Sequence, residues 1–263
     1  MDSVNSWKRQ ATRPLGIICG ASKDQEWLLP TWWERYTAFH SYPVTFCDFG
    51  MSQESLAFCR KRGEVISIEL DPLLIATKEE LPLRWVAHAH SVYGPRVFDF
   101  RLQWFKKPFA LLSSCYKKAL WLDLDCEILQ SIEPLLSQDL AEDALGLVRD
   151  YHHPALFADI KYNGGVILFH HGNRLLQKWA EQSLEKNHLF IGDDQLLSYL
   201  IAQGEGKVLP LEEIYNWKPS RGVNPSAVIM HWVGDAGKAY LRKWGGIKPA
   251  FHKSVGEPFS STP

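Results

Sequence analysis

The first part of the chain alternates short apolar runs with segments whose apolar residues recur at helical spacing. Residues 15–19, 43–49 and 65–70 form short runs bounded by glycine, proline or polar residues, as buried strands are. Residues 24–41 and 52–62 lie between them and predict helices, with a serine or glutamine near the start of the second. The pattern indicates a parallel sheet whose faces are covered by helices.

A further helix and strand follow a stretch without a clear pattern. Residues 71–97 contain three prolines and give no assignment. Apolar residues at i, i+3, i+7 and i+10 then predict a helix over 98–114, although Pro108 lies within it. Residues 119–122 predict a strand, and Asp123 follows it directly. Because open parallel sheets bind ligands at the carboxyl ends of their strands, we look for chemistry there.

The second half predicts an α/β domain with less regular alternation. Residues 146–149, 166–169, 208–211 and 227–231 indicate strands, and residues 175–184 and 196–202 indicate helices. Neither an internal repeat nor a long Gly/Ser linker divides the chain. We therefore expect a flexible segment over 1–14, a single domain over 15–240 and a basic tail over 241–263.

Composition and charge exclude several classes of protein. The chain of 263 residues has 29 lysines and arginines against 30 aspartates and glutamates, so it lacks the basic excess of nucleic-acid-binding proteins. Apolar stretches of signal-peptide or membrane-span length are missing, which predicts a cytoplasmic protein. The five cysteines form no close pair and are expected to be buried apolar residues.

The sequence Asp123-Leu124-Asp125 is the strongest chemical signal in the chain. Two carboxylates one residue apart at a strand end can converge on one divalent cation, while Leu124 points back into the core. The simpler interpretation is a solvated turn close to the start of a helix. Considered alone, His231 within the apolar run AVIMHW is typical of a core histidine.

Several blocks between residues 47 and 238 resemble, in their order along the chain, those of one enzyme family. The sequence PFALLSSCYKKALWLDLDCEIL, with Lys107 just before it, is similar to the metal-binding segment of GT-A glycosyltransferases, most closely the retaining enzymes of family 8. The turn CDFGMS at 47–52 resembles the turn after their second strand. Three further similarities are Asn163-Gly164-Gly165-Val166, Asp194-Gln195, and His231-Trp232-Val233-Gly234 with Lys238 beyond it.

This resemblance implies a fold, an activity and a set of site residues. The fold would be a Rossmann-like GT-A fold, in which a mixed, mostly parallel sheet is flanked by helices and carries Asp-X-Asp at a strand end. The activity would be transfer of a sugar from a nucleotide-diphosphate sugar, a UDP-sugar, with retention, to a glycan, lipid or protein acceptor that the sequence does not identify. Metal ligands for Mn²⁺ or Mg²⁺ would be Asp123, Asp125 and His231; donor-binding residues Gly20, Ala21, Lys107, Leu124, Asn163, Gly164, Gly234 and Lys238; catalytic residues Asp194 and Gln195.

The chemistry of the donor explains these residue types. A departing diphosphate needs charge neutralisation, which a divalent cation and compact lysine charges supply, and an imidazole ligand favours Mn²⁺ modestly. Two positions differ from the family pattern. The first predicted strand ends in CGAS without the usual aspartate, and Lys238 lies seven residues beyond His231 instead of six. The identity of the nucleotide base therefore stays open.

The other blocks can also be interpreted as purely structural features. Asn163-Gly164 is also typical of a turn before a strand, and Asp194-Gln195 of the start of a helix. The segment 236–256 contains five lysines and arginines and no acid. It would either close over the donor diphosphate or lie as a peripheral contact on an anionic membrane surface.

Two functions from other classes compete with sugar transfer. A non-catalytic module could bind a carbohydrate or nucleotide sugar, using some of the 11 tryptophans for stacking. A metallohydrolase could combine the aspartates with His88/His90, His152/His153 and His170/His171, but adjacent residues of a strand point to opposite faces and make poor joint ligands.

Overall fold

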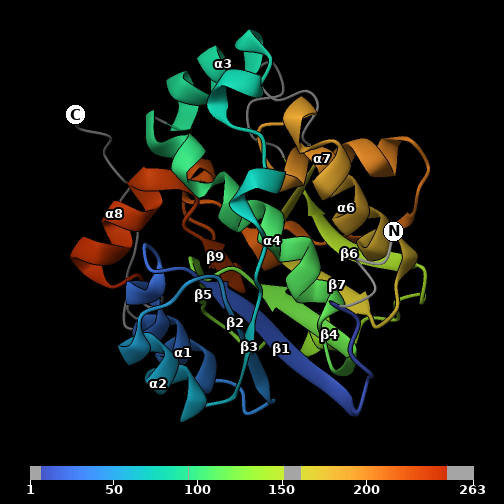
Figure 1. Cartoon of the computed structure of the whole chain (residues 1–263). Helices are drawn as coiled ribbons and strands as arrows, with labels where there is room; N and C mark the ends of the chain where they lie inside the picture. The colour runs from blue at the N-terminus through green and yellow to red at the C-terminus, as the bar shows by residue number, and fades with distance from the viewer. Residues whose placement is uncertain (1–6, 94, 151–160, 248–263) are drawn as a thin grey trace.

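A seven-stranded sheet forms the centre of the computed structural model, which describes residues 7–93, 95–150 and 161–247 (Figure 1). The strand order is β3-β2-β1-β4-β7-β6-β8. The strands are β1 (Arg13–Ala21), β2 (Val44–Asp48), β3 (Glu64–Ser67), β4 (Tyr116–Leu122), β6 (Ala144–Arg149), β7 (Tyr162–His170) and β8 (Lys207–Leu211). A second sheet pairs β5 (Cys126–Ile128) with β9 (Ile229–His231) in antiparallel fashion.

The antiparallel direction of one strand, β7, brings the second half of the chain to the end of β4. Strands β1, β2, β3 and β4 run parallel to one another, and β8 runs parallel to β6. Strand β7 runs antiparallel to both of its neighbours, β4 and β6. Consequently the start of β7 lies where β4 ends, with Leu122 opposite Val166. The predicted mixed, mostly parallel α/β sheet is confirmed.

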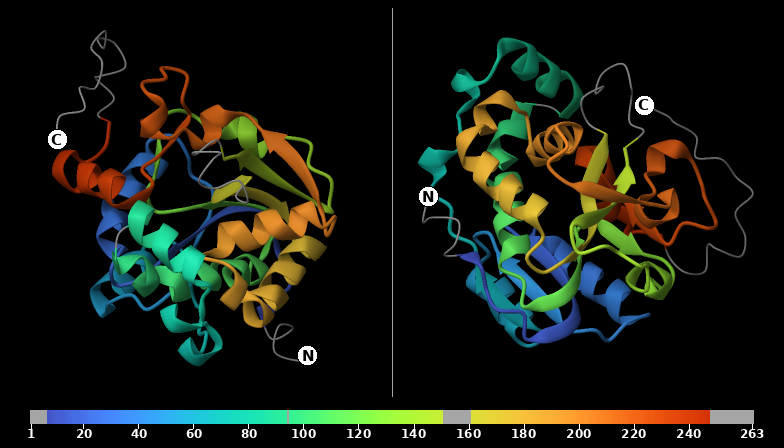
Figure 2. Two further views of the ribbon diagram at one scale, coloured as in Figure 1. Left: turned by 90° about the horizontal axis from the view of Figure 1, so that it is seen from above. Right: turned by 90° about the vertical axis from the view of Figure 1, so that its right-hand side faces the viewer.

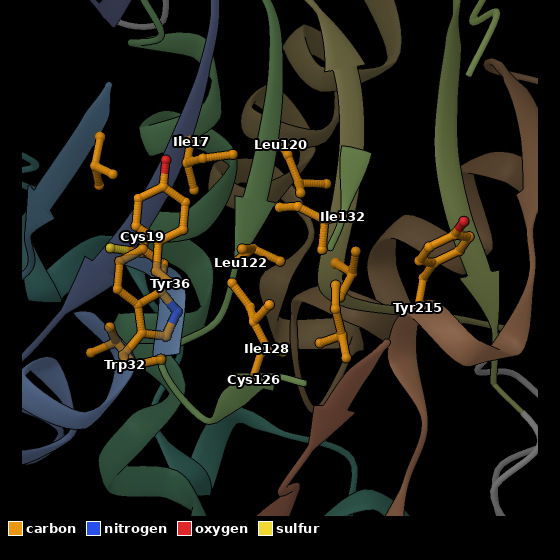
Figure 3. Close-up of a cluster of buried hydrophobic side chains, with 14 of the residues drawn as sticks. Ile17, Cys19, Trp32, Tyr36, Leu120, Leu122, Cys126, Ile128, Ile132 and Tyr215 are labelled. Atoms are coloured by element: carbon orange, nitrogen blue, oxygen red, sulfur yellow. The ribbon is translucent and has the colours of Figure 1, made fainter. Parts of the chain in front are cut away.

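Helices cover both faces of the large sheet (Figures 1 and 2). Alternate residues of β4 divide between two core clusters, because neighbouring side chains of a strand point to opposite faces. Leu120 and Leu122 pack with α1 (Leu29–Thr37), α2 (Gln53–Arg60) and the β5–β9 pair, and Figure 3 shows Leu122 beside Ile128 of β5. Ala119 and Trp121 pack with α4 (Arg101–Leu112), α6 (Arg174–Glu185) and α7 (Asp193–Ala202).

The sequence pattern misses the irregular parts of the chain. Residues 71–97 contain the short 3₁₀ helices η3 (Pro72–Leu74) and η4 (Lys78–Glu80) and the helix α3 (Leu83–Tyr93). The predicted helix over 98–114 divides into η5 (Pro95–Phe100) and α4, and Pro108 lies inside α4. The strand β5 and the helices α5 (Glu133–Leu136) and α8 (Gly234–Trp244) were not predicted. The Ser52 cap is confirmed, because its side chain accepts from the N–H of Ser55.

The described ends of the chain pack against the sheet and its helices. Of the segment 1–14 that the sequence predicts to be flexible, residues 1–6 lie outside the described residues; in the rest, the ring of Trp7 lies 5.6 Å from that of Phe109 and Arg9 pairs with Glu64. The predicted start of the basic tail at 241 falls inside α8. All five cysteines are free and buried, as expected. Within the described residues, no helix combines the length and the apolar character that crossing a membrane requires.

Candidate functional site

Two aspartates follow directly after β4, at the carboxyl edge of the large sheet. The N–H of Cys126 donates to the carbonyl oxygen of Asp123 (3.0 Å), which closes a turn between β4 and β5. Leu124 is buried in the core, while the carboxylates of Asp123 and Asp125 both face His231. The apolar residue between the two acids therefore anchors the turn that presents them.

His231 reaches the two aspartates from the other end of the chain. It is the last residue of β9 and lies opposite Cys126 in the β5–β9 pair. Its Nε2 is 3.3 Å from Oδ1 of Asp125 and 4.0 Å from Oδ2 of Asp123. Two carboxylates and an imidazole nitrogen within 4.0 Å of each of them form a donor set that suits Mn²⁺ or a similar divalent cation.

The thiol of Cys126 lies at the wall of this donor set. Its Sγ, a carboxylate oxygen of Asp125 and a ring nitrogen of His231 lie within 4.8 Å of one another. Burial, together with the charges of Asp123 and Asp125, raises the pKa of the thiol well above its usual value. The protonated thiol donates to the carbonyl oxygen of Gly165 (3.5 Å). Because the thiolate and not the thiol binds metal ions, Cys126 in this protonated state offers no ligand.

Lys107 of α4 lies on the other side of Asp123. Its Nζ is 3.4 Å from Oδ1 of Asp123, 3.3 Å from Oδ2 of Asp193 and 3.2 Å from the carbonyl oxygen of Gly164. Burial by itself would lower the pKa of Lys107, but the surrounding carboxylates, led by that of Asp123, raise it above its usual value. Lys107 is thus a permanent buried cation beside the two acids.

Lys238 of α8 supplies a second cation. Its Nζ donates to Oδ2 of Asp125 at 2.6 Å. Burial by itself would raise the pKa of Asp125, but Lys238 and His231 outweigh it and hold that pKa far below its usual range. Asp125 is therefore a carboxylate at every physiological pH, as a metal ligand or a lysine partner must be.

Asp194 is fastened to the start of β7. Its Oδ1 accepts from the backbone N–H of Gly164 (2.8 Å), and its Oδ2 accepts from Nδ2 of Asn163 (3.1 Å). Burial and the neighbouring carboxyl group of Asp193 raise the pKa of Asp194 to about 8. Helix α7 begins at Asp193, with Gly192 at its N-cap position. The prediction that these acids lie at the start of a helix is therefore confirmed.

Comparison with known proteins identifies the fold. No protein-family model matches the chain, and no curated protein matches its sequence. Its structure matches the galactosyltransferase LgtC, solved with donor and acceptor sugar analogues, at 16% identity and a TM-score of 0.59, over 88% of this chain and 96% of LgtC. The chain has the GT-A fold. Apo GlyE of Streptococcus pneumoniae (15% identity, TM-score 0.55, covering 92% and 62%) and the bifunctional WbbM (9%, 0.55, 85% and 46%) match similarly.

The remaining predicted site residues occupy ends of elements of this GT-A fold. Gly20 lies near the end of β1, where a Cβ atom would meet the ring of Phe49 at 2.5 Å, so close packing alone requires a glycine. The carbonyl oxygen of Ala21 accepts from the N–H of Phe49 (2.9 Å). Gly234, with φ +74°, begins α8, which carries Lys238.

Gln195 takes part in the turn before α7. Its Oε1 accepts from the backbone N–H of Ile191 at 2.8 Å, and the side chain is buried. This hydrogen bond holds the backbone of the turn that precedes Asp193 and Asp194. The structure therefore gives Gln195 a supporting role in this turn, in addition to the catalytic role that the sequence predicts.

Asn216 is a site residue that sequence reasoning missed. Its Oδ1 lies 2.7 Å from Nδ1 of His231, and its Nδ2 donates to Oδ1 of Asn163 (2.9 Å). Asn216 ends the 3₁₀ helix η7 (Glu213–Asn216) and is almost fully buried. A single asparagine after a predicted strand belongs to none of the recognised blocks, so the sequence offers no spacing that would single it out.

The metallohydrolase hypothesis is not supported by the histidines that the structure describes. His170 pairs with Lys118, in the first half of β4, whereas Asp123 follows the other end of that strand. Ring nitrogens of His170 and His171 lie within hydrogen-bond distance of the carbonyl oxygens of Leu140 and Arg9. His152 and His153, like the side chain of His88, lie outside the described residues.

Proposed function

We propose that the chain is a glycosyltransferase that depends on a divalent cation. It would transfer a sugar from a nucleotide-diphosphate sugar, a UDP-sugar, to a glycan, lipid or protein acceptor with retention of configuration. One observation carries the proposal. Asp123, Asp125 and His231 converge at the carboxyl edge of a GT-A sheet, with Nε2 of the histidine within 4.0 Å of both carboxylates.

The donor set fits Mn²⁺ or Mg²⁺. Asp123, Asp125 and His231 would hold the cation, which would supply Lewis-acid stabilisation of the departing diphosphate. The imidazole favours Mn²⁺ over Mg²⁺. Burial of His231 and Asp125 keeps bulk water from these groups and strengthens their electrostatic interactions.

The lysines and the start of β7 would bind the rest of the donor. Lys107 and Lys238 are compact cations that already contact the two aspartates and would neutralise phosphate oxygens beside them. Asn163 and Gly164 hold the carboxyl group of Asp194 at the start of β7, where it would contact the donor sugar. Backbone groups at Gly20, Ala21, Leu124 and Gly234, at the ends of elements, would line the donor pocket. Asp194 and Gln195 would be the catalytic residues, and Gln195 also holds the N–H of Ile191 before α7.

A screen of sugar nucleotides tests the proposal. We expect Mn²⁺-dependent hydrolysis or transfer with one donor, with the configuration of the new anomeric centre read by proton NMR. Asp125→Asn should abolish the reaction, while Asp143→Asn, which changes an exposed acid paired with Lys207, should leave it intact. Activity that survives both chelation and Asp125→Asn would refute metal dependence. Binding of UDP and Mn²⁺ without turnover of any donor would favour the non-catalytic binding module.

We further propose a cytoplasmic location with a peripheral membrane contact through α8. Lys238 faces Asp125, but Arg242 lies over the ring of Trp27 and Lys243 over that of Trp244, which is 56% exposed. Aromatic and basic side chains together are typical of interfacial helices. Vesicles containing phosphatidylserine should retain the protein at low salt. The variant R242E/K243E should bind less, and equal binding would refute the contact.

A further inference from the structure

A chain of hydrogen bonds through two asparagine side chains joins His231 to Asp194. Nδ1 of His231 meets Oδ1 of Asn216 at 2.7 Å, and Nδ2 of Asn216 donates to Oδ1 of Asn163 at 2.9 Å. Nδ2 of Asn163 then donates to Oδ2 of Asp194 at 3.1 Å. These four side chains come from β9, η7, β7 and α7, so the chain crosses the whole site.

A backbone N–H fixes the polarity of this chain. The N–H of Gly165 lies 3.0 Å from the Asn163 side chain, and because a backbone N–H only donates, the atom it meets must be Oδ1. Asn216 therefore approaches that oxygen with its NH₂ group and turns its own oxygen toward His231. Nδ1 of His231 must then carry a proton, so Nε2 is the only ring nitrogen that can offer a lone pair to a metal ion.

The resulting tautomer matches the geometry of the proposed metal ligands. Nε2 of His231 is the nitrogen that faces Asp123 and Asp125. His231 and Asn216 are both almost fully buried, so a lost bond between them would leave polar groups without a ready replacement from water. Hydrogen bonds of this kind orient the histidine ligands of metal sites.

We propose that Asn216 is a positioning residue that fixes the Nδ1–H tautomer of His231 and couples this ligand to the orientation of Asp194. The inference rests on the proposed function, because it takes His231 to be a metal ligand. Asn163 makes this connection: its Oδ1 accepts from Asn216, and its NH₂ group, together with the N–H of Gly164, donates to the two oxygens of Asp194.

The backbone around Asn216 is held independently of its side chain. The N–H of Trp217 donates to the carbonyl oxygen of Ile229 (2.9 Å), and the N–H of His231 donates to that of Trp217 (2.7 Å). The N–H of Val228 also donates to the carbonyl oxygen of Ile214 (2.8 Å). Substitution of the Asn216 side chain should therefore leave this part of the fold in place.

Two variants separate the two halves of the inference. Asn216→Ala removes both side-chain bonds. Asn216→Asp keeps an oxygen for Nδ1–H of His231 but has no NH₂ group for Asn163. Asn224→Ala is the matched control, because the side-chain oxygen of Asn224 accepts from the N–H of Ser226 in a local turn of the neighbouring loop, away from His231 and Asn163.

The first measurement is the tautomer of His231 in the metal-free protein, taken at alkaline pH where the ring is neutral and read from ¹⁵N chemical shifts and long-range ¹⁵N–¹H correlations with labelled histidine. We expect the Nδ1–H form in the wild type, in Asn216→Asp and in Asn224→Ala, and a mixture of forms in Asn216→Ala. The second is Mn²⁺ affinity from electron paramagnetic resonance of the free ion. Asn216→Ala should bind Mn²⁺ about 10- to 100-fold more weakly, with recovery in Asn216→Asp.

The outcomes distinguish the inference from the proposed function. If the wild type binds no Mn²⁺, the proposed function and the metal part of the inference both fail, while the tautomer still decides whether Asn216 positions His231. If the wild type binds Mn²⁺ and Asn216→Ala retains both the tautomer and the affinity, the inference is overturned. Melting curves of both variants identify any loss of fold, and in that case the Asn216→Asp data decide.

Discussion

The ammonium group of Lys107 lies among carboxylates that would otherwise repel one another. Its contacts to Asp123 and Asp193 are both within 3.4 Å, and the Lys107 and Asp193 side chains are almost completely buried. In such surroundings an unpaired charge is far more costly than a paired one. At the scale of single residues, the site is therefore held by charge compensation as much as by packing.

Replacement of Lys107 should destabilise the protein strongly. We expect Lys107→Met to lower the free energy of unfolding by about 3 kcal/mol, because it leaves buried carboxylates without their cation. Lys106→Met is the matched control: Lys106 is equally buried, but its Nζ donates to the carbonyl oxygen of Phe49, so about 1 kcal/mol should be lost. Denaturant unfolding measures both, and equal losses would contradict this account.

The pKa of Asp194 predicts a pH dependence of stability. Burial and the adjacent Asp193 raise this pKa to about 8, whereas an unfolded aspartate has a pKa of about 3.9. Between these values the folded protein holds a proton that the unfolded chain has released, so this group's stabilising contribution is lost as the pH rises. In Asp194→Asn without metal, the decline between about pH 5 and pH 8 should be shallower by up to about 1.4 kcal/mol per pH unit.

An exposed aspartate provides the comparison for this prediction. The hydrogen bond from Lys207 lowers the pKa of Asp143, so this carboxylate is ionised in both states over the same pH range. Asp143→Asn should therefore leave the slope unchanged. Chemical denaturation at a series of pH values gives the three slopes, and an unchanged slope in Asp194→Asn would contradict the raised pKa.

At the scale of elements, the start of β7 packs closely against the end of β9. A Cβ atom on Gly165 would lie 2.2 Å from Cε1 of His231 and 2.5 Å from Nδ1. The carbonyl oxygen of Gly165 also accepts from the N–H of Asp123 (2.9 Å). A single glycine thus lets β4, β7 and β9 meet with Asp123 and His231, two of the three proposed metal ligands, in place.

Enlargement of this glycine should displace the histidine. We expect Gly165→Ala to weaken Mn²⁺ binding about tenfold or more, because the added methyl group occupies the space of the imidazole. Gly146→Ala in β6 is the control, since its Cβ would meet only leucine side chains, at 3.0 Å and beyond. Isothermal titration with Mn²⁺ compares them, and an equal affinity of Gly165→Ala and wild type would contradict the expectation.

At the scale of the whole molecule, the site exists only where distant segments meet. Asp125 and Lys238 are 113 residues apart, and the reversed strand β7 and the β5–β9 pair bring the second half of the chain to the end of β4. A ligand that bridges these segments should therefore stabilise the complete fold. We expect this effect to be visible as a cooperative shift of the melting temperature.

Thermal unfolding with UDP tests this expectation. At about 100 times the dissociation constant, a ligand adds about 2.7 kcal/mol, which for a chain of this size corresponds to a rise of about 5–10 °C. The rise should require Mn²⁺ and disappear in Asp125→Asn. The same rise in the presence of a chelator would show that UDP binds without the cation.

The sequence alone predicted most of the regular fold, because strand and helix patterns arise from neighbouring residues. The strands over 15–19, 43–49 and 119–122 and the start of α2 at Ser52 were predicted in this way. The short strand β5 was missed, because three residues carry too little periodicity to distinguish a strand from a turn.

The sequence by itself determined which residues could carry the chemistry: the carboxylates that follow β4, a histidine near the other end of the chain, and the lysines at 107 and 238. Only the tertiary structure decided that Nε2 of His231 faces these carboxylates and that Asn216 holds its other nitrogen. The physical reason is the separation along the sequence of the residues that interact. Periodicity records contacts a few residues apart, whereas the site depends on strand order and register between segments that have no local signal in common.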